Sequence, residues 1–244
     1  MQSTQTKTIV LFDLDNTLFD HYHSLGTAIS AVQERYASLK GHRLEDLIAR
    51  YNAALERAYD KYLSKEILYE ETDVMKVHLF FTELGMAEPN LEEVKEFRAI
   101  YKPAYRKNRR ATPGSVETLV RLREHGCCLA IVSNGQIEDQ AAKAEAIGIR
   151  HLADRIFTSE EVGYCKPDRR IFQFAIEALG ASPDMIHMVG DSVDLDIKGA
   201  LDAGLSPVLY SLEAQESHRL LFGVKVPVIR HIGQLVEHLG MANP

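Results

Sequence analysis

Two carboxylates, Asp13 and Asp15, stand one residue apart after an apolar run, Ile9 to Phe12, in a strand expected to begin at Thr8. Such a run is typical of a parallel strand covered on both faces, so the two acids fall at or just past its carboxyl end. Open α/β sheets bind ligands at that edge. Because carboxylates this close repel each other, they require a neutralising cation. A divalent metal ion together with a phosphoryl group would meet that need.

Three later polar segments carry further chemistry. Ser133-Asn134-Gly135 joins a hydroxyl, an amide and a glycine that lets backbone N–H groups approach an anion. Lys166-Pro167 places a lysine before a helix, and Gly190-Asp191 with Asp196 supplies two more acids. In a parallel sheet all of them fall at carboxyl ends of strands. Each segment alone occurs by chance in many proteins. The segments in this order, each at the end of a strand, together form a specific signal for a single site.

The elements that must position these residues alternate between strand and helix. Residues 8–18 and about 113–240 show this alternation, which indicates βα units and a parallel sheet. The later strands are expected at Cys127–Ser133, Arg155–Thr158, Met185–Gly190, Pro207–Tyr210 and Val226–Ile229. Thr112 before Pro113 predicts a capped helix start, and Ser182 before Pro183 repeats the pattern.

Between about residues 20 and 110 the strand pattern is absent, and apolar residues recur at helical spacing. Thr72 is expected to cap one helix of this insert. Asn90 with Glu93 resembles a capping box for the next helix, Leu91–Arg109, which Pro103 is expected to kink. The linkers to the insert are expected at Phe19–Ser24 and Lys107–Pro113. The tyrosines of the insert are interpreted as packing residues.

Composition narrows the function. The 244 residues carry a net charge of −7, which argues against a nucleic-acid or membrane-surface partner. Residues 1–7 are polar and contain no signal-peptide core, and no apolar run approaches the length of a membrane-spanning helix. The three cysteines form neither a disulfide framework nor a zinc-binding spacing. We therefore expect a cytoplasmic protein, monomeric or homodimeric.

The four segments together resemble the motifs of the haloacid dehalogenase-like (HAD) superfamily: Asp13-Leu14-Asp15-Asn16-Thr17, Ser133-Asn134, Lys166-Pro167 and Gly190-Asp191 with Asp196. The helical insert after the first motif is similar to that family's type 1 cap. The resemblance implies an α/β fold, with a Rossmann-like, doubly wound parallel sheet as the core (residues 1–19 and 111–244) and an inserted α-helical cap domain (residues 20–110). Among HAD proteins the motifs look most like small-molecule phosphatases of the nucleoside 5′-monophosphatase and N-acylneuraminate-9-phosphatase groups.

This resemblance implies a phosphatase acting on a small phosphorylated metabolite, a nucleoside monophosphate or a sugar phosphate. Asp13 would be the nucleophile and form an aspartyl-phosphate, while Asp15 would protonate the leaving oxygen and later activate water. Mg²⁺ prefers oxygen ligands, and the carboxylates of Asp13 and Asp191 with the carbonyl of Asp15 would supply them.

The phosphoryl group needs positive charge and donors around its oxygens. Ser133 and Lys166 are the expected phosphate-binding side chains, and the backbone amides of Asn16 and Asn134 are expected nearby. Asp196 is expected behind the residues that touch the metal ion and the phosphate, where it would orient a metal-bound water or Lys166.

Three other functions remain open. A phosphomutase on the same scaffold needs a cation on the cap facing the site, for which Arg50, Arg57 and Lys61 are candidates. A haloacid dehalogenase would use the same nucleophile without metal, and Asp15 and Asp191 count against it. A non-catalytic binding protein would have no need of the intact set of acids.

Four remaining residues have plainer interpretations. Asp194 is expected to cap the helix that runs to Ala203, and Cys165 is interpreted as a passive small residue. His21 and His23 are interpreted as linker or substrate-lining residues rather than metal ligands.

Overall fold

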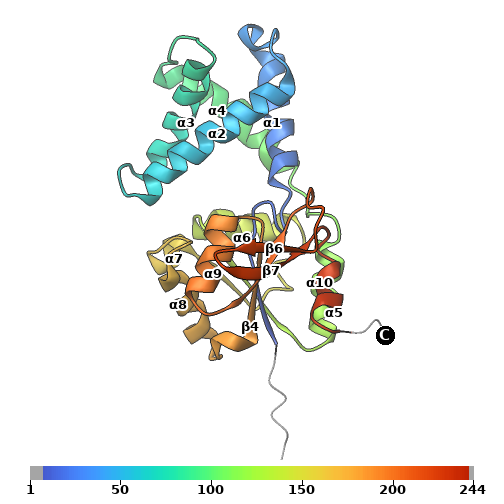
Figure 1. Cartoon of the computed structure of the whole chain (residues 1–244). Coiled ribbons are helices and arrows are strands. Elements are labelled where there is room, and N and C mark those ends of the chain that lie inside the picture. Colours follow the sequence, from blue (N-terminus) through green and yellow to red (C-terminus); the bar gives the residue numbers. More distant parts are fainter. Residues whose placement is uncertain (1–7, 242–244) are drawn as a thin grey trace, which may run out of the picture. The chain divides into compact units, whose positions relative to one another are not determined.

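The computed structural model describes residues 8–241, so the polar segment at residues 1–7 lies outside the described part. The chain forms two compact units. Residues 21–109 form a helical unit, and an α/β unit combines the chain up to Asp20 with the chain from Arg110 onward. Figure 1 shows the strands gathered in one unit and the long helices in the other. Within residues 8–241 no helix is both long and apolar enough to cross a membrane.

The α/β unit is built on a seven-stranded sheet in the order β3-β2-β1-β4-β5-β7-β6, counted over the described residues. The strands are β1 (Ile9–Phe12), β2 (Cys128–Ser133), β3 (Arg155–Thr158), β4 (Ile186–Gly190), β5 (Ser206–Tyr210), β6 (His218–Leu221) and β7 (Val224–Ile229). All neighbours pair in parallel except β6 with β7. The expected α/β fold is confirmed.

The central strand β1 is apolar because both of its faces are covered. All four of its residues are buried, and β1 pairs with β2 on one side and β4 on the other. Ile9 and Leu11 belong to a core cluster that includes Phe172 of helix α8. Helices α8 (Arg169–Leu179) and α9 (Lys198–Asp202) lie on one face of the sheet, and α5 (Ser115–Glu124) and α10 (Gln234–His238) on the other (Figure 1). This burial fixes the strand whose end carries Asp13.

Two further helices belong to this unit: α6 (Ile137–Ala146) and α7 (Ser159–Val162). A single 3₁₀ turn, Pro183–Met185, stands where Ser182 and Pro183 predicted a helix. The predicted start at Thr112 is wrong, because α5 begins at Ser115 after Gly114, whose φ of 82° is left-handed. The Thr112 carbonyl instead accepts the N–H of Ser115 in a turn. Strand β6 was not expected from the sequence, because half of its residues are exposed.

The helical unit contains α1 (His21–Arg35), a 3₁₀ turn (Ala37–Leu39), α2 (Leu44–Leu63), α3 (Tyr69–Glu83) and α4 (Leu91–Lys107). The capping box at Asn90 is confirmed: its side chain accepts the N–H of Glu93, whose carboxylate accepts the N–H of Asn90. Thr72 is no cap, because α3 begins three residues earlier and the Thr72 hydroxyl donates to the carbonyl of Tyr69 inside the helix.

Aromatic rings fill the core of the helical unit. Tyr51 of α2 lies 5.5 Å from the ring of Phe97 and 4.9 Å from that of Tyr101, measured between centroids. Phe80 of α3 packs edge-on against Tyr51 at 5.4 Å. Tyr51 is fully buried and Tyr101 nearly so, so these two tyrosines are packing residues, as expected.

The first crossing between the units is shorter than the expected linker, because α1 already starts at His21. The second is as long as expected, because α4 ends at Lys107 and α5 starts at Ser115. On the α/β side the crossing segments pair as a small ribbon. Phe19 bridges Ala111, and Arg110 donates two hydrogen bonds to Oδ2 of Asp20, at 2.9 and 2.7 Å. This ribbon ties the chain leaving the first motif to the chain that returns.

One half-buried acid of the helical unit pairs with three cations. Asp73 of α3 accepts from Lys76 at 2.6 Å and from Lys102 at 2.9 Å, and it also pairs with Arg98. Burial alone would raise the pKa of Asp73, but Lys76 and Lys102 lower it to about 2. This carboxylate therefore stabilises the fold in its charged form.

We predict that Asp73→Asn lowers the free energy of unfolding at pH 7 by about 1–3 kcal/mol, because three cations lose their shared partner. Since the folded pKa lies below the unfolded one, the contribution is complete above about pH 4 and disappears as pH falls to about 2. Urea unfolding at several pH values measures the difference. The exposed Asp60→Asn is the control. An equal loss at pH 7 and pH 2 would contradict the prediction.

Candidate active site

Asp13 is held at the sheet edge by the strands beside it. Its N–H donates to the carbonyl of Val189 in β4 at 2.8 Å, which continues the pairing of β1 by one residue. The side chain is buried, and Oδ1 accepts a hydrogen bond from Nζ of Lys166 at 2.6 Å. Oδ2 is buried and has no hydrogen-bond partner among residues 8–241. An acceptor with free lone pairs therefore faces the site.

Lys166 is the cation that balances this acid. Its ammonium group is buried and donates to Oδ1 of Asp196 at 2.6 Å as well as to Asp13. Burial by itself would lower the pKa of Lys166, but the charges of Asp13 and Asp196 outweigh burial and raise this pKa above its ordinary value. Two of its three N–H donors are thus occupied, which leaves one for a ligand.

Asn134 fixes the backbone of Lys166. Its Oδ1 accepts the N–H of Lys166 at 2.7 Å, and its Nδ2 donates to the Lys166 carbonyl at 3.1 Å. The Asn134 side chain is therefore a clamp between two loops. Ser133, the last residue of β2, is buried at the same edge of the sheet.

Asp196 comes from a π-helical turn, Val193–Ile197, that follows β4. Its Oδ2 accepts the N–H of Ser192 at 3.0 Å. Ser192, whose side chain accepts the N–H of Leu195, caps this turn, so the expected cap role of Asp194 is wrong. Gly190 leaves the room that Asp196 needs, since an added Cβ would lie 2.2 Å from Oδ2 of Asp196.

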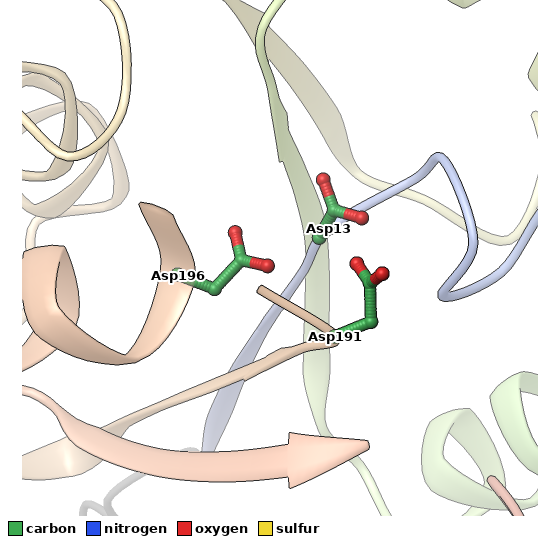
Figure 2. A group of neighbouring side chains, drawn as sticks. All are labelled: Asp13, Asp191 and Asp196. Atoms are coloured by element: carbon green, nitrogen blue, oxygen red, sulfur yellow. The ribbon is translucent and has the colours of Figure 1, made fainter. Parts of the chain in front are cut away.

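Asp191 completes a cluster of acids. One oxygen from each of Asp13, Asp191 and Asp196 lies within 4.8 Å of the others. Figure 2 shows the carboxyl group of Asp191 directed toward that of Asp13, with that of Asp196 beside them. Thr17 donates to Oδ1 of Asp191 at a long 3.4 Å.

The charge of this cluster is only partly balanced. Burial raises the pKa of Asp13 to about 7, against the opposing effect of Lys166. Burial and the charge of Asp13 raise the pKa of Asp191 to about 8. Carboxylates whose charged forms are this unfavourable, with an unpartnered oxygen among them, suit a hard divalent cation. The donor set fits Mg²⁺, with Asp13 and Asp191 as the available carboxylates.

Asp15 pairs with a cation, Lys143, that the sequence did not predict as a site residue. Lys143 of α6 donates to both carboxylate oxygens of Asp15, at 2.8 and 2.9 Å, and is itself buried. The signal was a lysine on the buried face of the helix, three residues after Gln140. Helical periodicity predicts that such a residue points inward, but not toward which loop.

The turn after Asp15 uses the backbone amide that was expected at the phosphate. Asn16 has a left-handed φ of 64°, and its N–H donates to the carbonyl of Phe19 at 2.8 Å. This amide therefore closes the turn in this structure and is not available to a ligand. The buried Oδ1 of Asn16 has no hydrogen-bond partner within the described residues.

The candidate cations of the insert pair within the helical unit. Arg50 donates to the carbonyl of Glu83 at 2.9 Å, and Arg57 pairs with the Glu83 carboxylate. Lys61 pairs with Glu66 at 3.1 Å. His21 lies 2.7 Å from the hydroxyl of Tyr105 through its Nδ1.

A model of the haloacid dehalogenase-like hydrolases matches residues 7–204 of the chain. The chain belongs to this family. It is 34% identical, over 94% of its length and 98% of the relative's, to a glyceraldehyde 3-phosphate phosphatase of Methanothermobacter thermautotrophicus. It is 31% identical, over 96% of both chains, to a ribulose-1,5-bisphosphate 5-phosphatase of Halopiger xanaduensis.

The fold is likewise that of this HAD family. The crystal structure of the HAD hydrolase YfnB from Bacillus subtilis, bound to magnesium, superposes with a TM-score of 0.78 at 21% identity, over 97% of this chain and all of the other. The resemblance in fold extends over both units of the chain.

We predict that Gly190→Ala displaces Asp196 and lowers the free energy of unfolding by about 1–3 kcal/mol, because the new methyl group would also lie 2.5 Å from Cβ of Asp196. Chemical denaturation measures the loss. The control is Gly41→Ala, where an added Cβ meets no atom within 4 Å. Equal stability of the two variants would contradict the tight approach of Gly190 to Asp196.

Proposed function

We propose that this protein is a Mg²⁺-dependent phosphatase that hydrolyses small sugar phosphates through a phosphorylated Asp13. The observation that carries the proposal is the buried Asp13 carboxylate, which Lys166 orients through one oxygen while the other has no partner in the described chain. The two sugar phosphatases at 34% and 31% identity support this substrate class over nucleoside monophosphates.

In the first half of the proposed reaction, a carboxylate oxygen of Asp13 attacks phosphorus and the bond from phosphorus to the ester oxygen breaks. Asp15 enters this half in its protonated form, in which the second half of the preceding turnover leaves it, and gives its proton to the departing oxygen, which leaves as the alcohol. Ser133 and the remaining N–H of Lys166 would bind the phosphoryl oxygens, where negative charge must be offset.

In the second half, Asp15 takes a proton from water as the water oxygen attacks phosphorus. The bond between phosphorus and Asp13 breaks, phosphate departs and the Asp13 carboxylate is restored. Mg²⁺, held by Asp13, Asp191 and the Asp15 carbonyl, would supply positive charge to the crowded acids and the phosphoryl group. Asp196 would keep Lys166 in place.

The alternative is a phosphomutase, which keeps the phosphoryl group on the sugar. It would need a second phosphate-binding cation, and Arg50, Arg57 and Lys61 are each paired with acids or carbonyls of the helical unit. Released inorganic phosphate supports the hydrolase, and an isomerised sugar phosphate supports the mutase.

We predict that the protein releases phosphate from triose and pentose phosphates in a Mg²⁺-containing panel that also holds nucleoside monophosphates. Asp13→Asn should lower the rate at least about 1000-fold, because an amide is a poor nucleophile. Phosphate release is the measurement, with excess EDTA and Mg²⁺ re-addition as the metal arm.

The matched control is Asp202→Asn on α9, an exposed acid that pairs with Lys198. It should retain wild-type activity. Phosphate release that persists in Asp13→Asn would refute Asp13 as nucleophile, and full activity in EDTA would refute the metal requirement. If the wild-type protein released phosphate from none of the esters, the proposed phosphatase activity would be refuted.

A further inference from the structure

Helix α6 directs two polar side chains into the loops of the site. Gln140 and Lys143, one turn apart, are both buried on its inner face. Gln140 donates to the carbonyl of Asn134 at 3.3 Å, and Lys143 donates to both oxygens of Asp15. A single helix thus braces the loop after β2 and the loop after β1.

Lys143 also contacts residues other than Asp15. Its ammonium also lies 3.4 Å from Asp139, one helical turn back, and 5.6 Å from the ring centroid of Phe19. Phe19 is fully buried and its backbone bridges Asp15. Lys143 therefore holds the Asp15 side chain, and the turn that ends at Phe19 holds the Asp15 backbone.

Stability alone gives little reason for a buried ammonium at this position. Burying a lysine costs several kcal/mol unless it is well paired, and replacing a buried ion pair with apolar side chains is often neutral or stabilising. The Asp15 side chain is 29% exposed, so water could solvate it without Lys143. A methionine would fill the same inward position of α6.

We infer that Lys143 is a positioning residue that sets the side-chain orientation of Asp15 for proton transfer to the leaving oxygen. This inference rests on the proposed phosphatase function. The charged form of Asp15 accepts from the ammonium through both oxygens. In the protonated form one oxygen can stay on the ammonium while the other carries the proton, which must lie within hydrogen-bond reach of the ester oxygen. Lys143 acts through Asp15 and itself neither gives nor takes the proton.

The way in which the cleavage rate of Lys143 variants depends on the leaving group distinguishes a positioning role from a purely structural one. The alkoxide that departs from a sugar phosphate must be protonated as the bond to phosphorus breaks. The p-nitrophenolate ion is stable without a proton, so its departure does not require a well-placed acid. Loss of Asp15 orientation should therefore slow cleavage of the alkyl ester selectively.

The test compares single-turnover release of alcohol from a triose phosphate with release of p-nitrophenol from p-nitrophenyl phosphate. Lys143→Met and Lys143→Gln should slow the alkyl ester by about tenfold or more and the aryl ester by less than about threefold. Asp15→Asn should show the same selectivity in stronger form, and Lys143→Arg should recover part of the loss. Lys198→Met, which removes an exposed lysine paired with an acid four residues away, is the matched control.

Thermal unfolding shows that each compared variant is folded, and the glutamine variant carries the test if the methionine variant is not. Equal slowing of both esters, or no slowing of either, would overturn the role of Lys143 and leave the proposed function standing. A wild-type protein that cleaves neither ester would overturn both.

Discussion

The site depends on one buried ammonium shared by two carboxylates. Lys166 lies within 2.6 Å of an oxygen of both Asp13 and Asp196, and all three side chains are almost fully buried. Without this cation, acids from two different strand ends would repel each other in a medium that screens charge poorly. Because the ammonium has only one remaining N–H, the arrangement also leaves a single donor directed at a ligand.

The α/β scaffold supplies these residues from separate strand ends. Asp13 follows β1 and Asp191 follows β4, which are hydrogen-bonded neighbours, so the sheet itself sets their separation. A second buried lysine, Lys143 of helix α6, pairs in the same way with Asp15. The two acids of the first motif are thereby paired with different ammonium groups. We infer that this division assigns them separate tasks, with Asp13 open to phosphorus and Asp15 oriented for proton transfer.

The sequence predicted what depends on local pattern and missed what depends on distant pairing. The parallel core and the capping box at Asn90 follow from burial and from spacing over a few residues, and both are confirmed. Lys143 could not be paired with Asp15, because 128 residues separate them and helical periodicity reports burial rather than partners. Thr72 failed as a cap because Leu68 is the N-cap of α3 and Thr72 already lies inside the helix.

Trapping the phosphorylated protein tests the central claim, that Asp13 receives the phosphoryl group. The protein would be mixed with a triose phosphate and Mg²⁺, quenched in acid during the first turnover and digested for mass spectrometry. The account predicts one phosphoryl group on the peptide that contains Asp13, and none in Asp13→Asn. A phosphoryl group on another residue, or phosphate formed in the first turnover with Asp13 never labelled, would contradict it.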